Sequence, residues 1–251
     1  MIPKIIHFCW LSNEPYPEFI SKCMYSWKEK MPDYQIKKWD TTNFDIESIP
    51  FAKEAFDCRK WAFAADVIRL YALYTEGGIY LDSDVFVKKS FDNYLDNGFL
   101  SAIEFNKFDY IDSIKSKLID CKGNKLKDVI QVPGVGIQAA VIAAEKGHPY
   151  VKDCLDYYKD RHFINKDGSF DNIVIAPDIL AYFAVKYGFK YKDKEQILNN
   201  GIRILSSSYI AGHPKCQDNK NIAVHCCTGT WRKISLLQKI IKHIRYKLYI
   251  K

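Results

Sequence analysis

The sequence of 251 residues contains no apolar run as long as the ~20 residues that a helix needs to cross a bilayer. Its start, MIPKIIHFCW, lacks the basic segment and the small-residue cleavage site of a secretory signal peptide. None of the eight cysteines has C-x-x-C spacing, and the adjacent pair Cys226-Cys227 suits neither a normal disulfide nor a zinc clip. We therefore expect a cytoplasmic protein whose cysteines are reduced.

Glycine-rich phosphate-binding loops are also missing. The sequence has no G-x-x-x-x-G-K-[ST] motif, and Gly134-Val135-Gly136 lacks the third glycine of a dinucleotide-binding loop. A phosphate group must then be bound by other means, and we infer a metal ion held by aspartates.

The sequence does contain 48% apolar and 15% aromatic residues, enough for a large core. Strand-like segments alternate with helix-like segments, which favours an α/β sandwich around a mostly parallel sheet. We expect strands at about 2–10, 34–39, 79–86, 98–105, 202–205 and 222–226, and helices at 19–31, 61–76, 148–162 and 177–187. No repeat or low-complexity linker interrupts them, so we predict one domain, residues 1–231, and a tail, residues 232–251.

The positive charge of the chain belongs to this tail. Residues 231–251 carry seven of the 37 basic residues and no acid, which leaves 30 residues of each sign elsewhere. Apolar side chains recur at steps of three and four on one helical stripe: Ile234, Leu237, Ile241, Ile244 and Leu248. We predict a basic amphipathic helix that lies on an anionic membrane surface, with docking onto the domain as the alternative.

The most informative stretch runs from Trp61 to Val87. An apolar segment of helical length ends at Gly77-Gly78, where glycine supplies the left-handed residue that closes a helix. Asp66 and Arg69 share one face of this helix, and buried charges are costly unless they meet each other or a ligand. The residues that follow alternate, which places Asp82 and Asp84 on one side of a predicted strand.

An Asp-x-Asp pair at the end of a strand suits a hard divalent ion, Mn²⁺ or Mg²⁺, which in turn can neutralise a diphosphate. The motif alone is weak, and a solvated strand end is the alternative interpretation of Asp82 and Asp84. For Asp66 and Arg69 the alternative is an internal ion pair that only stabilises the helix.

These residues resemble glycosyltransferase family 32, the DXD sugar-binding-region group that includes bacterial capsule and lipopolysaccharide enzymes and the fungal initiating mannosyltransferase. The resemblance rests on AADVIRLYALYTEGGIYLDSDV and on IPKIIHFCW, Trp27, Pro32-Asp33-Tyr34, Trp39-Asp40, QAAVIAAEKGHPY, APDIL and AVHCCTGTW. The same core is similar to that of the clostridial glucosylating toxins. The resemblance implies a GT-A fold and a retaining, metal-dependent transfer of a hexose from a nucleotide sugar, UDP-linked, to a glycan or lipid-linked acceptor.

The resemblance also implies roles for single residues. Asp66 and Arg69 would hold the donor sugar, Asp84 would ligate the ion, and Asp82 would touch the ribose or a metal-bound water. His225 would be the metal or diphosphate ligand from a late strand. Trp10 would stack on the nucleobase, unless it is a plain core residue, Tyr80 would pack at the nucleotide, and Trp231 would cover the diphosphate.

Two positions depart from the family pattern. Gln138 stands where an asparagine is expected, which leaves its sugar contact open, and Cys226 replaces a common second histidine. Asp178 is a further candidate contact to donor or acceptor, whereas His7 and His148 are expected to be structural.

The chemistry inferred from this resemblance is attack on the anomeric carbon from the face of the leaving group. The leaving phosphate would accept the acceptor's proton, because no second carboxylate presents itself as a nucleophile. The family further implies cell-surface polysaccharide synthesis at the inner face of a bacterial membrane.

Two alternatives belong to other classes. LDSDVF resembles the first motif of haloacid-dehalogenase-type phosphatases, in which Asp82 would be the nucleophile, although Phe86 stands where that motif has Thr or Val. A non-catalytic protein that binds membranes or anionic polymers through its tail is the other. Nucleic acid is not an expected partner.

Overall fold

The computed structural model of the chain describes residues 1–12 and 14–227. Its main sheet has the strand order β2-β1-β3-β7-β5-β9-β8, with β6 paired to β5. The strands are β1 Ile5–Cys9, β2 Gln35–Trp39, β3 Gly78–Leu81, β5 Phe99–Phe105, β6 Val135–Ile137, β7 Val141–Ala144, β8 Gln196–Ile197 and β9 Ile202–Leu205. Strands β2, β1, β3, β5 and β9 run in one direction and only β6, β7 and β8 oppose them, so the predicted mostly parallel sheet is confirmed.

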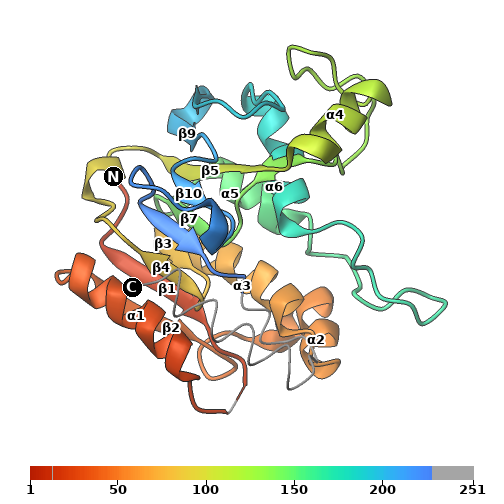
Figure 1. The fold of residues 1–251 in the computed structure, drawn as a ribbon. Coiled ribbons are helices and arrows are strands. Elements are labelled where there is room, and N and C mark those ends of the chain that lie inside the picture. The colour runs from red at the N-terminus through yellow and green to blue at the C-terminus, as the bar shows by residue number, and fades with distance from the viewer. Residues whose placement is uncertain (13, 228–251) are drawn as a thin grey trace.

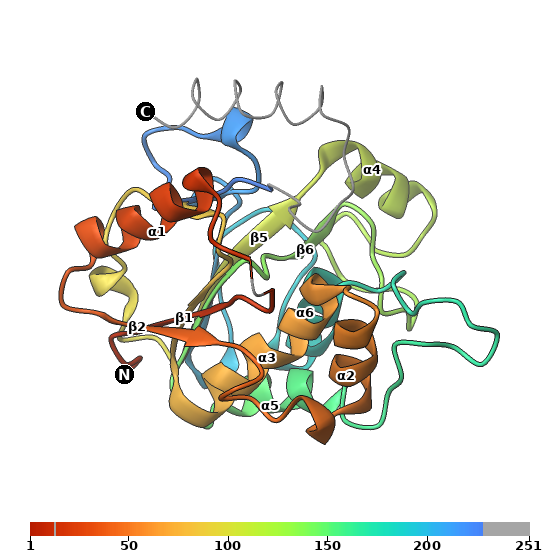
Figure 2. The same cartoon turned by 90° about the horizontal axis from the view of Figure 1, so that it is seen from below.

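Helices cover both faces of this sheet, as Figures 1 and 2 show. They are α1 Glu18–Lys30, α2 Pro50–Asp57, α3 Trp61–Glu76, α4 Lys107–Lys115, α5 Pro149–Asp156 and α6 Ala176–Ala184, with single 3₁₀ turns at Ile46–Ser48, Asp92–Tyr94, Val185–Tyr187, Asn199–Gly201 and Pro214–Cys216. Helices α2, α3, α5 and α6 share one apolar core. Helix α1 packs on the opposite face together with a small second sheet, β10 Ile210–Ala211, β11 Ala223–His225 and β4 Val85–Val87.

Helix α3 is buried along most of its length because nearly all its side chains are apolar. It ends where predicted, since Gly77 has φ 70° and its N–H donates to the Leu73 carbonyl. Gly78 follows with φ 112°, and a Cβ there would lie 2.5 Å from the Ile5 carbonyl oxygen. Only glycine fits this close approach of the turn to β1, which fixes where β3 begins.

His7 closes the same corner from β1. Its Nε2 lies 2.7 Å from the Gly77 carbonyl oxygen, and its Nδ1 accepts a hydrogen bond from Trp39 Nε1 at 2.9 Å. Because Nδ1 accepts, Nε2 carries the proton that goes to Gly77, and burial lowers the pKa of the ring. The expected structural role of His7 matches this geometry. His148 is likewise structural, as its Nδ1 caps α5.

Helix α1 fixes the strand that follows the two aspartates. Trp27 Nε1 donates to the Val85 carbonyl at 2.7 Å, and the Val87 N–H donates to Ser26 Oγ at 2.9 Å. Both α1 residues are buried, so these bonds are shielded from water and hold β4 against the helix.

Two sequence predictions differ from the structure, and one helix was missed. The strand expected at 79–86 is two strands in two sheets, because the chain turns at residues 82–84 after Leu81. Helix α2 was not predicted, although Pro50 occupies its first position, where proline is favoured. Helix α5 ends at Asp156 rather than near residue 162.

The predicted tail helix, 232–251, lies outside the described residues. Within residues 1–12 and 14–227, no helix is both long enough and apolar enough to cross a membrane.

Candidate active site

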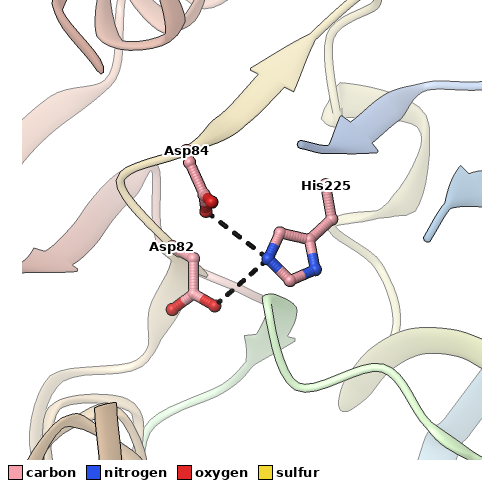
Figure 3. A group of neighbouring side chains, drawn as sticks. All are labelled: Asp82, Asp84 and His225. Atoms are coloured by element: carbon pink, nitrogen blue, oxygen red, sulfur yellow. Dashed lines mark ion pairs between the residues drawn. The ribbon is translucent and has the colours of Figure 1, made fainter. Parts of the chain in front are cut away.

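The turn between β3 and β4 brings together the three predicted metal ligands. Asp82 and Asp84 lie in the turn, and β11 pairs antiparallel with β4 so that His225 lies opposite Val85. The Cys226 N–H also donates to the Asp84 carbonyl at 3.0 Å. One ligand atom from each of Asp82, Asp84 and His225 therefore lies within 4.8 Å of the others (Figure 3).

The contacts in this group are ionic. His225 Nε2 is 3.4 Å from Asp84 Oδ1 and 3.9 Å from Asp82 Oδ2. Burial lowers the pKa of His225, but Asp84 opposes it so strongly that the pKa lies well above its ordinary value. Asp84 is 8% exposed, whereas Asp82 and His225 are both half-buried, so solvent reaches the group beside these two residues.

Arg69 joins the predicted helix pair to the turn. Its Nη2 is 2.8 Å from Asp66 Oδ1 and 3.4 Å from Asp82 Oδ1, and its Nη1 donates to the Ala139 carbonyl at 2.5 Å. Only 5% of Arg69 is exposed. The guanidinium thus contacts two carboxylates at once and holds the β6–β7 loop against α3.

The two members of the buried pair respond differently to burial. Burial raises the pKa of Asp66 to about 7, even though Arg69 acts in the other direction. Burial also opposes the charge on Arg69, but the charge of Asp82 raises the pKa of the guanidinium, which stays protonated. We regard Arg69 as permanently charged and Asp66 as the member that titrates, because guanidinium has by far the higher intrinsic pKa.

Tyr80 contacts Asp82 directly, and Gln138 contacts it through the backbone of Ala140. The Tyr80 hydroxyl donates to Asp82 Oδ1 at 3.1 Å, and the Arg69 guanidinium lies 4.7 Å from the centre of its ring. Gln138 Oε1 accepts from the Ala140 N–H at 3.2 Å, and the Ala140 carbonyl accepts from the Asp82 N–H at 2.9 Å. Tyr80 is 1% exposed and Gln138 is 2% exposed, so both are buried where they fix the position of Asp82.

Trp10 follows β1 and is half-buried, with its ring 4.9 Å from that of Tyr16 and its Nε1 donating to the Glu14 carbonyl. Asp178 is buried at the start of α6, where its Oδ2 accepts from the Ile175 N–H and from Gln131 Nε2. Those bonds occupy Asp178 as a helix cap. Trp231 lies outside the described residues.

Two residues near His225 were not predicted from the sequence. Cys227 Sγ lies 3.1 Å from the Gly212 carbonyl oxygen and 3.5 Å from His225 Nδ1. When the thiol donates to Gly212, its sulfur can accept the Nδ1 proton, which turns Nε2 toward the aspartates. In the sequence, only the position of Cys227 two residues after His225 could have indicated that it orients the imidazole.

Glu104, near the end of β5, is the other residue that was missed. Its side chain is exposed, but the surrounding protein excludes enough water to raise its pKa, and the charge of His225 opposes that rise. Asp178 and Asp82 raise the pKa of Glu104 further. No motif marks Glu104, since a single acid near a strand end is common in any α/β protein.

Residues 17–100 match the family model described as "Glycosyltransferase sugar-binding region containing DXD motif". This range contains α3, the Gly77-Gly78 turn and both aspartates. The chain therefore carries the DXD glycosyltransferase region. The match covers about a third of the chain and ends at residue 100, within the first two residues of β5, so the more weakly similar segments beyond residue 100 lie outside it.

Curated proteins similar to part of this chain include glycosyltransferases. Inositol phosphoceramide mannosyltransferase 3 of Schizosaccharomyces pombe is 36% identical over 98 residues, which cover 38% of this chain and 27% of the relative. An uncharacterized glycosyltransferase of Acanthamoeba polyphaga mimivirus is 33% identical over 109 residues, covering 39% of this chain and 42% of the relative. The chain thus spans about a quarter of the length of the yeast relative and under half of the viral one.

Among solved structures, PaToxG glycosyltransferase is 18% identical, with a TM-score of 0.49, and the match covers 74% of this chain and 69% of that one. The galactosyltransferase LgtC, solved with donor and acceptor sugar analogs, is 17% identical, with a TM-score of 0.46 over 90% of this chain and 87% of that one.

Proposed function

We propose that this protein is a metal-dependent glycosyltransferase that moves a hexose from a nucleotide sugar to a glycan or lipid-linked acceptor, with retention at the anomeric carbon. The observation that carries the proposal is the convergence of Asp82, Asp84 and His225 beside the buried pair Asp66 and Arg69. These residues come from α3, the β3–β4 turn and β11, so only the folded chain assembles them.

The three side chains Asp82, Asp84 and His225 fit a divalent cation as ligands. Two carboxylates and one imidazole supply hard oxygen and borderline nitrogen ligands, which favours Mn²⁺ and also allows Mg²⁺. Such an ion would be held by Asp84 and His225, with Asp82 as the third ligand or as acceptor for a bound water. When bound, it would neutralise the charge that builds up on the leaving nucleoside diphosphate.

The protein's own groups would bind and orient the donor. Arg69 keeps Asp66 and Asp82 close to each other, so sugar hydroxyls would meet fixed acceptors at a buried wall. Asp66, with its raised pKa, can donate or accept a hydrogen bond to such a hydroxyl. We assign Trp10 to the nucleobase, where its half-exposed ring could stack, and Tyr80 and Gln138 to the support of Asp82. Trp231 remains a proposed cover for the diphosphate on the basis of sequence.

The acceptor's proton would go to the leaving phosphate, with attack from the same face of the sugar. Glu104 is the carboxylate beside the group that could orient an acceptor hydroxyl, since its exposed side chain lies near His225. Glu104 does not contribute to the proposed donor site.

The yeast relatives bear on the choice of donor. Their names describe mannosyltransferases, so GDP-mannose belongs beside UDP-hexoses in any screen. Synthesis of a cell-surface polysaccharide at the inner face of a bacterial membrane remains a proposal from sequence alone.

Hydrolysis of donors in the absence of acceptor tests the proposal. The protein is incubated with Mn²⁺ and a panel of UDP- and GDP-sugars, and the release of nucleoside diphosphate is followed. We expect slow release from one donor class, and its loss with EDTA. Failure with every donor, together with hydrolysis of a simple phosphate ester that Asp82→Asn abolishes, would favour the phosphatase alternative instead.

A further inference from the structure

A cavity of about 730 Å³ lies at the end of β5, outside the group of Asp82, Asp84 and His225. It is lined by Phe105, Tyr110, Cys121, Lys122, Asn124, Lys190, Lys192, Asp193 and Lys194. The Tyr191 N–H donates to the Gly123 carbonyl at 2.9 Å, so the two loops that form its walls are bound to each other. All these residues follow position 100, beyond the part of the chain that matches the DXD model.

The charge of this cavity is strongly one-sided. Four lysines line it, Lys122, Lys190, Lys192 and Lys194, against the single acid Asp193. The Asp193 carboxylate already accepts hydrogen bonds from the Ser207 N–H and hydroxyl. Lys190 Nζ donates to the neutral side chain of Asn124. Among the described residues, none of the four lysines lies within ion-pair distance of a carboxylate.

The sign of the lining differs from that of the body of the chain, because residues 1–230 carry equal numbers of basic and acidic residues. Like charges that share one concave wall repel each other, and the field between low-dielectric walls is stronger than on a flat surface. A bound anion would remove that repulsion. The cavity is therefore suited to a negatively charged ligand.

Two aromatic rings add a second kind of surface. The Phe105 and Tyr110 rings lie 5.2 Å apart, and both are half-buried. Small-molecule sites combine such apolar walls with a few polar groups that fix orientation. A sugar ring offers an apolar C–H face and can carry an anionic substituent, so it matches both features, whereas an inorganic anion would use only the lysines.

The place of the cavity in the fold relates it to the acceptor side. Phe105 directly follows Glu104 at the end of β5, and Glu104 is the carboxylate that the proposed function assigns to the acceptor. Successive strand residues point to opposite faces, so the cavity and Glu104 flank the end of β5 on its two sides. We propose that this lysine cavity binds an anionic sugar, phosphate- or carboxylate-bearing, which under the proposed function is part of the acceptor.

Direct binding without donor or metal tests the inference separately from transfer. The full chain is titrated with glucose 6-phosphate, glucuronate, glucose and inorganic phosphate, and binding is followed by calorimetry or NMR at low salt. We expect one or both anionic sugars to bind at least about tenfold more tightly than glucose and than phosphate, and their order identifies the anionic group. Binding should weaken as salt screens the lysines. Equal affinity for glucose, or for phosphate alone, would overturn the inference.

A charge-reversal pair with a matched control locates the site. Lys192→Glu with Lys194→Glu should weaken binding of the anionic sugar at least about tenfold, since attraction becomes repulsion. Lys28→Glu with Lys166→Glu makes the same change in net charge at exposed positions elsewhere, and should leave binding within about twofold. Equal losses in both variants would mean non-specific attraction and would refute the site. Lys192→Gln with Lys194→Gln should give an intermediate loss, and melting curves confirm that each variant folds.

The outcomes also distinguish the two proposals. Donor hydrolysis that persists while the lysine variants bind sugar normally would refute the cavity alone. Sugar binding that depends on these lysines, in a protein that hydrolyses no nucleotide sugar, would refute the transferase and leave the cavity standing.

Discussion

Replacing Arg69 by methionine is expected to destabilise the protein strongly. Methionine keeps much of the apolar volume but removes a guanidinium that contacts Asp66, Asp82 and the Ala139 carbonyl. Because Arg69 is only 5% exposed, water cannot replace these contacts. Breaking a buried ion pair by removing one partner costs ~3–5 kcal/mol, because Asp66 must then take up a proton or stay charged without a partner, and Asp82 loses the same partner.

For a domain of this size, each kcal/mol lowers the melting temperature by about 2–4 °C, so we expect a fall of about 6–20 °C. Calorimetry without metal measures it. Arg203→Met is the matched control, since Arg203 pairs with Glu195 at 2.9 Å but is about a third exposed, and such pairs contribute at most ~1 kcal/mol.

A double variant tests the physical reason. Adding Asp66→Asn to Arg69→Met removes the carboxyl that has lost its partner, so above pH 7 the double variant should be more stable than Arg69→Met alone. The reasoning is wrong if Arg69→Met melts within about 2 °C of the wild type, or if the double variant is the less stable of the two.

Three further predictions follow from other parts of the molecule. Burial raises the pKa of Asp66 to about 7, so its proton stabilises the fold below about pH 4, and that stability is lost as pH rises toward 7. In EDTA, Asp66→Asn should flatten the dependence of the free energy of unfolding on pH over this range. An unchanged dependence would contradict the assignment. Gly78→Ala should lower the stability measured by urea denaturation by several kcal/mol, because φ is 112° and the new Cβ would lie 2.5 Å from the Ile5 carbonyl oxygen. The control Gly188→Ala, at φ 104° with nothing within 4 Å, should cost only ~1–3 kcal/mol of backbone strain. From sequence alone, the chain should co-sediment with phosphatidylglycerol vesicles at low salt, and removal of residues 234–251 should abolish this while sparing donor hydrolysis; equal binding to neutral vesicles would count against it.

The central part of the fold could be predicted because local and global signals agree there. The apolar pattern of α3, the two glycines that end it and the alternation of β3 each specify the same structure. Gly77 and Gly78 both have positive φ, as a helix end and a close approach to β1 require.

The second sheet could not be predicted as a sheet, although one of its strands, β11, lies within the strand expected at 222–226. Its strands have only two or three residues, too short for a period to show, and the alternation of Leu81, Ser83 and Val85 continues across a turn as if no break existed. That alternation produced the wrong prediction of one strand at 79–86.

The candidate site shows a similar division. Asp66, Arg69, Asp82, Asp84 and His225 could be named from the sequence, since they lie in recognisable segments. Their geometry required the structure, because Arg69 reaches Asp82 only through the packing of α3 on β3, and His225 reaches Asp84 only through the pairing of β11 with β4. Glu104 and Cys227 become visible only through their proximity to His225.

Binding of Mn²⁺ and donor hydrolysis by Asp84→Asn, measured side by side, test the central claim most directly. Asp84 is buried and its carboxylate faces His225, so the amide should remove a ligand charge while keeping the shape of the turn. We expect the variant to fold like the wild type, to bind Mn²⁺ at least about tenfold more weakly by electron paramagnetic resonance, and to lose nearly all turnover. Asp96→Asn, at an exposed position outside the group, should change neither property. Wild-type turnover in Asp84→Asn at saturating Mn²⁺ would contradict the assignment of this site.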